Sequence, residues 1–374
     1  SGTLQAGVYA DQVFGYDSFG AASIVLGKAG SANATLDLGS GTTARPITLA
    51  TGNSGTLTIA TTGASAVYSG AITGPGNLVF FRNSSTSDAF TISGTINNAG
   101  TVTFTTVSPN ADNRRYTVSG EIGSSVTDLT LRVSSPSSNA NASTFSGPIK
   151  NTGALLIEGQ AGASGPVTLS GTISSISSLT LTSLSGTTPR AIFSAANTFT
   201  APVSIQSGTL IASNAQALGI DSAVTLANSA NAVLNPSGVN LAIGSLSGGG
   251  ATGGNVFFVN AASRLTTGGA NTNTTFSGSA SGAGGFTKVG TGTFTLDGTT
   301  TNTGTNFVNQ GTLRLASAGA ISTAPMNVAE SGVLDLAVNV ATTGTVTMSG
   351  SAATILGVGT LTAPGYAFTN TSGT

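Results

Sequence analysis

The sequence predicts an all-β fold, a parallel β-helix in which successive coils of the chain stack on one another. A short motif, Ser-Gly-x-Ile, recurs in the first half with its serines at positions 69, 93, 119, 146 and 170. Recurrence at such a period indicates a solenoid. Apolar residues alternate with Ser and Thr around each motif, as in half-buried strands, and no helical period of useful length occurs. We therefore expect about 25 residues per coil and almost no helix.

Each repeat contains a second apolar strand a few residues after the motif. These strands carry the pairs Leu78/Phe80, Val102/Phe104, Leu129/Leu131, Leu155/Ile157 and Leu179/Leu181. A single coil cannot bury its inward-facing Ile, Leu, Val and Phe, whereas coils stacked at about 4.8 Å make one continuous core. Gly, Asn, Ser and Pro fill the segments between the strands, as expected of corners.

The second half of the chain keeps the same strand pattern with a looser period. Strands are predicted at 199–205, 209–212, 223–227, 256–259, 294–296, 312–315, 333–336 and 346–348. The glycine-rich run 248–254 predicts a wide loop at 247–255 inside one continuous solenoid over residues 31–374, because strands of the same kind lie on both sides. Residues 1–30 form a separate aromatic-rich segment in this interpretation, either a cap or an element that docks onto another subunit.

Charge and residue types exclude several functions. Lys and Arg number 11 and Asp and Glu 12, so 6% of the residues are charged, against about 25% in a typical soluble domain. The net charge of −1 provides no attraction for nucleic acid, and no stretch approaches the roughly 18 apolar residues of a membrane helix. Because Cys and His are both absent, we expect no metal site and no cofactor. For the same reason, stability should change little with pH near neutrality.

Motifs in the segment from about 199 to 336 resemble the passenger-associated repeats of bacterial autotransporters and related surface proteins. Residues 284–296 read GGFTKVGTGTFTL, similar to the family pattern GGLTKxGxGTLTL with Phe286 and Phe294 at the Leu positions. Residues 300–313 follow the pattern NTYTGxTxVNxGTL, but the aromatic residue between Asn302 and Thr303 is missing. The resemblance implies a right-handed parallel β-helix on a secreted or surface-displayed protein. It brings no catalytic residues.

Carboxylates are the candidate catalytic groups, because enzymes also occur on β-helices. Asp88 and Asp112, separated by about one coil, are the pair that stacking would bring closest, and a glycosidase needs two carboxyls roughly 5–9.5 Å apart. Arg114 and Arg115 lie beside Asp112, so a solvated corner with ion pairing explains the pair better than catalysis does. Trp is absent and Tyr is rare, which leaves few sugar platforms for an enzyme. We expect a non-enzymatic protein.

The two ends of the chain carry the residues predicted to contact another subunit. A solenoid exposes unpaired backbone and an open core at its ends, and neither end shows an amphipathic helix or a charge cluster. A heterologous contact between the two ends that does not close would propagate into a filament. An aromatic plug formed by the N-terminal segment is the alternative. The residues assigned to the head-to-tail contact are Leu4, Tyr9, Phe14, Tyr16, Phe19, Tyr366 and Phe368.

These observations favour a secreted, extracellular structural protein at the cell surface, which either assembles with itself into a fibre or forms a surface stalk. The first alternative is an adhesin passenger domain that binds glycans or surfaces along the solenoid. The second is a polysaccharide-processing enzyme, which the residue types disfavour. The partners that we expect for this protein are further copies of itself and surface glycans.

Overall fold

The chain divides into two compact units, residues 1–192 (unit 1) and 193–374 (unit 2), in a computed structural model. The structure describes residues 4–6, 23–30, 33–62, 65–82, 89–106, 115–133, 142–160, 166–184, 188–321 and 323–369. The sequence-based boundary at residue 30 falls beside segments outside these ranges and stays a prediction.

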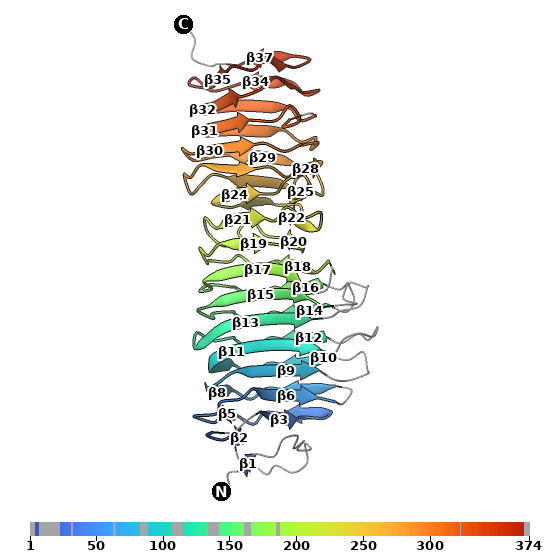
Figure 1. Cartoon of the computed structure of the whole chain (residues 1–374), viewed down its shortest axis with the longest axis vertical. Coiled ribbons are helices and arrows are strands. Elements are labelled where there is room, and N and C mark those ends of the chain that lie inside the picture. The colour runs from blue at the N-terminus through green and yellow to red at the C-terminus, as the bar shows by residue number, and fades with distance from the viewer. Residues whose placement is uncertain are drawn as a thin grey trace. The chain divides into compact units, whose positions relative to one another are not determined.

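Unit 1 is a stack of coils (Figure 1). Its strands pair with those of neighbouring coils in three parallel ladders. The first ladder contains β1 (Leu4–Ala6), β2 (Ile24–Leu26), β5 (Ile47–Leu49) and β8 (Ile72–Pro75), and continues into the start of β11 (Ile96–Thr106). The second contains β3 (Ala34–Asp37), β6 (Leu57–Thr61), β9 (Leu78–Arg82), the end of β11, β13 (Val126–Val133), β15 (Ala154–Gly159) and β17 (Ser178–Ser183). The third contains β4 (Gly41–Thr43), β7 (Ala66–Tyr68), β10 (Ala89–Ile92), β12 (Arg115–Val118), β14 (Ser143–Phe145) and β16 (Pro166–Leu169), and β18 (Arg190–Phe193) spans the unit boundary.

Unit 2 is built in the same way from three ladders and one short pair. One ladder contains β19 (Val203–Ile205), β21 (Ala223–Leu226), β24 (Ser245–Gly248), β27 (Thr274–Phe276), β30 (Thr293–Leu296), β31 (Asn306–Leu315), β32 (Met326–Leu336) and β35 (Thr354–Gly357). Another contains β23 (Asn240–Ala242), β26 (Arg264–Thr267), β29 (Gly285–Lys288), the starts of β31 and β32, β34 (Val346–Met348) and β37 (Tyr366–Phe368). The third contains β20 (Gly208–Ala212), β22 (Ala232–Pro236), β25 (Asn255–Phe258) and β28 (Ser279–Gly282), and β33 (Val340–Ala341) pairs with β36 (Leu361–Thr362).

The predicted parallel β-solenoid is confirmed, and the described residues contain no helix. In unit 1 the isoleucines that end the Ser-Gly-x-Ile motifs stack in register on successive coils and form an isoleucine column. Each motif therefore marks one coil, as the spacing predicts. This column consists of Ile72, Ile96, Ile122, Ile149 and Ile173. In the later part of unit 2 the coils are shorter, at about 20 residues, since Leu296, Leu315 and Leu336 stack in register. The right-handed sense that the family resemblance implies stays a prediction.

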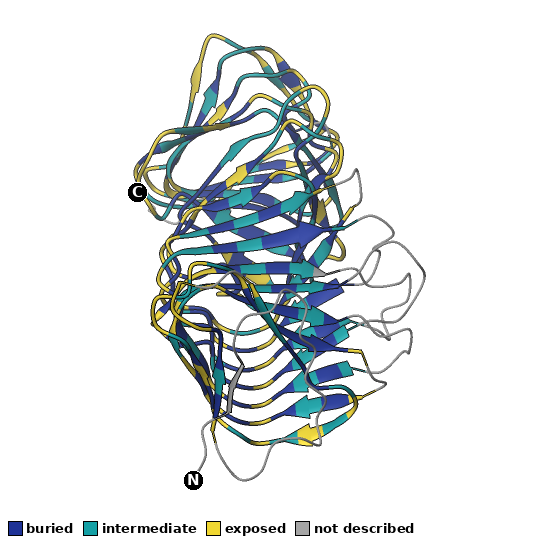
Figure 2. Cartoon of the chain, turned by 60° about the horizontal axis from the view of Figure 1, so that its bottom comes forward, coloured by how far each residue is buried: buried dark blue, intermediate teal, exposed yellow. Residues whose placement is uncertain are grey.

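Buried residues alternate with more exposed ones along many strands, among them β9, β10 and β30 (Figure 2). In unit 1, Phe80 and Phe104 stack face to face from neighbouring coils, with ring centroids 4.7 Å apart. Tyr116 meets Phe104 edge to face at 5.2 Å, and its buried hydroxyl lies within hydrogen-bond distance of two backbone carbonyls, Phe80 O and Thr105 O. In-register stacking of like side chains therefore fills the core without leaving this polar group unpaired.

A column of glycines explains the second position of the Ser-Gly-x-Ile motif. A Cβ atom built on Gly94, Gly120, Gly147 or Gly171 would lie 1.7 to 2.0 Å from the carbonyl oxygen of the motif glycine one coil earlier. No real Cβ contact is that short, so only glycine lets the backbones of successive coils approach at this corner. The Ile that completes the motif turns inward and is buried, whereas the Ser that begins it is exposed.

The few charged side chains include opposite charges paired across neighbouring coils. Arg132 is in register with Glu158, and Arg314 with Asp335, and each pair is joined by an ion pair of 2.6 to 2.7 Å. A parallel in-register stack places each side chain directly above another, so a row of like charges would repel along the ladder. A low content of charged residues avoids such repulsion, and in these two pairs the opposite charges neutralise each other.

One lysine occupies an inward-facing row of unit 2. Lys288 is in register with the core residue Val308 and is 1% exposed. Its Nζ atom donates hydrogen bonds to the carbonyls of Val289 and Gly290, both at 2.7 Å, and of Gln310 at 3.2 Å. Burial lowers the pKa of Lys288 to about 8, because removal from water disfavours the charged ammonium group.

We predict that replacing Gly120 by Ala lowers the free energy of unfolding by about 2–4 kcal/mol, because the added methyl overlaps the backbone of the preceding coil. Urea unfolding followed by circular dichroism measures the change. Ser119→Ala is the matched control, since Ser119 is the exposed neighbour in the same motif. Equal stabilities of the two variants would contradict the close approach of the coils at this corner.

The pH dependence of stability should report on Lys288. Because its pKa is about 8 when folded and near the ordinary 10.5 when unfolded, the unfolded chain binds more protons between these values. The free energy of unfolding should therefore be nearly flat from about pH 5 to about pH 7.5 and rise as pH increases above about 8. Urea titrations up to about pH 9.5 keep below the range in which the buried Tyr68 and Tyr116 would oppose the trend, because burial raises the pKa of both. A slope that persists unchanged in Lys288→Met would contradict this assignment.

Candidate binding surface

The Ser-Gly-x-Ile motifs place one exposed hydroxyl per coil along a corner of unit 1. The serines of this row are Ser69, Ser93, Ser119, Ser146 and Ser170, and each is exposed while the glycine that follows is buried. Successive coils lie about 4.8 Å apart, so the row repeats at that interval. A surface of regularly spaced hydroxyls with little charge can contact a polar, uncharged ligand through hydrogen bonds.

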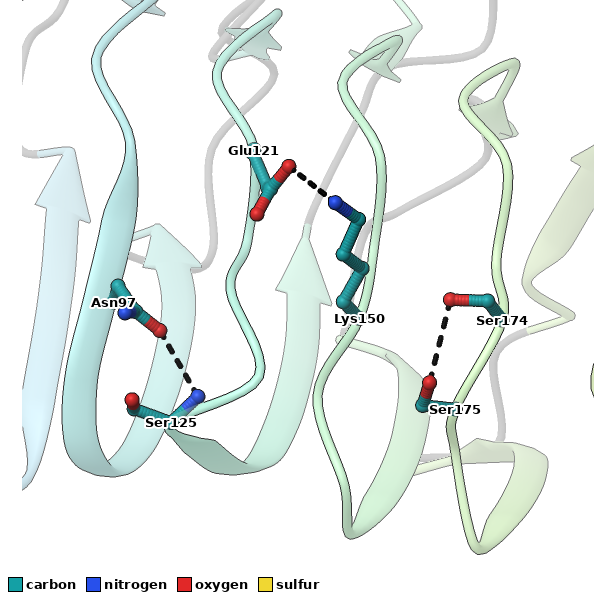
Figure 3. Close-up of polar contacts among 6 residues, drawn as sticks. All are labelled: Asn97, Glu121, Ser125, Lys150, Ser174 and Ser175. Carbon is teal, nitrogen blue, oxygen red and sulfur yellow. Dashed lines mark hydrogen bonds and ion pairs between the residues drawn. The ribbon is translucent and has the colours of Figure 1, made fainter.

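Polar side chains beside this row mainly bind the next coil (Figure 3). Asn97 accepts a hydrogen bond from the backbone N–H of Ser125 at 2.9 Å, and Lys150 forms an ion pair with Glu121 at 2.7 Å. Ser174 and Ser175 share a hydrogen bond at 3.3 Å. The Lys150–Glu121 pair is solvent-accessible, so it contributes at most about 1 kcal/mol. These contacts mainly fasten coils together.

Unit 2 repeats the same corner and adds a groove beside it. Residues 276–280 read FSGSA and residues 296–300 read LDGTT, so Asp297 stands where the first motif has Ser277. The groove has a volume of about 480 Å³. Its lining consists of Gly250, Ala251, Ser277, Gly278, Ser279, Asp297, Gly298 and Thr299.

The glycine-rich loop forms one side of this groove. Gly250 and Gly253 exchange backbone hydrogen bonds across a tight turn. Asn228 on the preceding coil holds the turn, since its Oδ1 atom accepts hydrogen bonds from both the backbone N–H and the hydroxyl of Thr252, at 2.9 and 2.7 Å. The coil that contains the loop runs from Gly248 to the stacked residue Phe276 and is longer than the next coil, from Phe276 to Leu296. The extra length provides the chain that forms this turn.

The glycines keep the groove free of side chains at its base. A Cβ on Gly278 would lie 1.8 Å from the carbonyl oxygen of Gly254, and one on Gly298 would lie 1.7 Å from that of Gly278. The column that allows coils to approach in unit 1 therefore recurs here. Glycine at both positions leaves no side chain between the hydroxyl and carboxylate groups of the lining.

The polar groups of the groove suit hydrogen bonding to a ligand. Ser277 donates a long hydrogen bond of 3.4 Å to Asp297 Oδ2, and Ser279 donates to Asn255 Oδ1 at 2.5 Å. Asp297 and Thr299 are exposed. A carboxylate accepts up to about four hydrogen bonds, and a hydroxyl both donates and accepts. The groove can thus bind a ligand rich in hydroxyl groups.

The structure places only some of the residues assigned to head-to-tail contact. Leu4 lies in β1, in register with Ile24, and Tyr9, Phe14, Tyr16 and Phe19 lie outside the described residues. Tyr366 and Phe368 lie together in β37 and are in register with Val346 and Met348, so they extend the ladder of β34. They are 49% and 74% exposed. Association through these residues stays a prediction.

The candidate catalytic pair cannot be placed, because Asp88 and Asp112 both lie outside the described residues. Among the residues that are described, no cluster of three or more Asp, Glu, His or Cys is positioned to hold a metal ion. Within the same ranges, no helix has the length and apolar character needed to cross a membrane.

The groove combines a glycine-rich segment that the sequence singles out with a second side that it does not. The run 248–254 predicts a wide loop, whereas the strand pattern does not single out Ser277 and Asp297. The signal that could have found them is the recurrence of the Ser-Gly corner at 277–278 and 297–298 with a carboxylate in place of one hydroxyl.

Comparison with known proteins supports the family resemblance. The chain is 32% identical over 238 residues, 62% of its length, to a protein named adhesin BmaC autotransporter from Brucella suis biovar 1 (strain 1330). The chain spans 6% of the length of that relative. No family model matches the chain, and no solved structure matches it. Together with the β-solenoid fold, this similarity confirms the resemblance to autotransporter-type proteins that the motifs indicated.

Proposed function

We propose that this chain is part of the passenger of a bacterial surface adhesin, a non-enzymatic extracellular solenoid that binds glycans or other surfaces. The observation that carries the proposal is the similarity to an autotransporter adhesin over 62% of the chain. Adhesion is the alternative to self-assembly in the sequence interpretation, and the similarity favours it over the fibre.

The physical character of the exterior supports adhesion to neutral, hydroxylated surfaces. The sequence is rich in Ser, Thr and Asn, and its net charge is −1. Hydrogen bonds from many weak, repeated sites can add up when a surface presents many copies of the same ligand. Screening by salt should weaken such binding little, because few of the contacts are between charges.

Binding of the purified chain to a glycan array and to cultured mammalian cells tests the proposal. We predict saturable binding that changes less than about threefold between about 0.15 and 1 M NaCl, because the surface is nearly uncharged. Heat-denatured chain is the control for adsorption of exposed apolar residues. Absence of binding to both arrays and cells would contradict the proposal, as would binding that high salt abolishes.

A further inference from the structure

We propose that the groove of unit 2 formed by Gly250, Ser277, Ser279, Asp297 and Thr299 is a saccharide-binding subsite, with Phe257 as its aromatic platform. The inference rests on the proposed adhesin function and names the ligand class and the place where it binds. The occupant is one or two sugar rings of a neutral glycan.

The groove offers the hydrogen-bonding groups that a sugar ring requires. Two neighbouring ligand hydroxyls can donate to the carboxylate of Asp297, whose Oδ2 atom accepts a long bond from Ser277. The hydroxyls of Ser277 and Thr299 can donate or accept, which suits ligand groups of either orientation. A volume of about 480 Å³ is within the usual range for small-molecule sites.

An exposed aromatic residue, Phe257, lies on the same outward face of β25 as Asn255. Phe257 is 43% exposed, and its neighbours Val256 and Phe258 are both buried in the core. It is two positions along β25 from Asn255, which accepts the hydrogen bond from Ser279 in the groove. Two strand positions correspond to about 7 Å, so a ligand of one or two rings in the groove can reach the phenyl ring. The apolar face of a sugar ring packs on such a ring while its hydroxyls bind the polar side.

A cation fits the groove less well than a saccharide does. Calcium takes about six to eight oxygen ligands, several of them carboxylates. The groove contains a single carboxylate, and its other side chains are hydroxyls and methyl groups. One acidic group among hydroxyls matches a hydroxylated neutral ligand.

Saturation-transfer NMR with the full chain tests the subsite directly. The probes are lactose, cellobiose and mannobiose, each titrated to tens of millimolar, and the variants are Phe257→Ala and Asp297→Asn. We expect at least one disaccharide to bind the unaltered chain, and both variants to weaken its binding by about tenfold or more. Matched controls are Tyr366→Ala, a half-exposed aromatic elsewhere in unit 2, and Glu330→Gln, an exposed carboxylate. Circular dichroism melting checks that all four variants remain folded.

The outcomes separate the subsite from the adhesin function. Disaccharide binding that is lost in the groove variants and kept in the controls supports the subsite, even if the chain adheres to no cell. Binding that all variants retain, or no binding of any of the three disaccharides, overturns it. Disaccharide binding that Phe257→Ala and Asp297→Asn both retain overturns the subsite and leaves the adhesin function intact where the unaltered chain still adheres to cells. A calcium titration that perturbs the protein in an Asp297-dependent way, without disaccharide binding, would assign the groove to a cation instead.

Discussion

The distance between backbones of neighbouring coils governs the rest of this structure. Parallel strands on successive coils hydrogen-bond at about 4.8 Å, and the same residue position recurs at that interval along each face. Inward-facing positions therefore stack like on like, as the isoleucines of unit 1 do from Ile72 to Ile173. At the corner where the chain turns inward, the approach is too close for a Cβ atom, and glycine occupies the position in coil after coil.

The same spacing accounts for the composition of the exterior. Charges of one sign in a row would repel at every coil, whereas hydroxyls and carboxamides can bond to the coils above and below. The structure shows both consequences. Ion pairs such as Arg132–Glu158 join opposite charges on adjacent coils. Side-chain oxygens of Asn33, Asn77, Asn97 and Asn271 accept hydrogen bonds from backbone N–H groups one coil further on.

A binding site on such a solenoid arises where one coil departs from the regular length. The long coil between Gly248 and Phe276 adds the glycine-rich turn, and the turn forms one side of a groove over a corner that otherwise repeats. Replacement of the corner serine by Asp297 then introduces a carboxylate at this place. Function in this account depends on local departures from a repeating scaffold, so the scaffold itself can remain unchanged.

The fold could be predicted from the sequence because its signal repeats. Paired residues such as Leu78 and Phe80, predicted from alternation alone, are fully buried in β9 and stack on Val102 and Phe104. The groove could not be predicted, because Gly, Ser and Asp carry no apolar pattern and their proximity depends on which coils stack. Lys288 is a partial exception, since alternation with Phe286 places it on the inward face but does not reveal the three carbonyls that its ammonium group reaches.

Disulfide cross-linking tests the central claim, one motif per coil, most directly, because the chain contains no cysteine of its own. In the double variant Ser93→Cys/Ser119→Cys, the two thiols lie on adjacent coils. Each comes directly after one member of the in-register pair Ile92 and Val118. Their Cα atoms should be about 5 Å apart, which is within the range that a disulfide spans. The account predicts rapid and nearly complete disulfide formation in this variant. In Ser93→Cys/Ser146→Cys the two cysteines are two coils apart, at about 10 Å, and no disulfide should form within the monomer. Equal cross-linking of both pairs, or of neither, would contradict it.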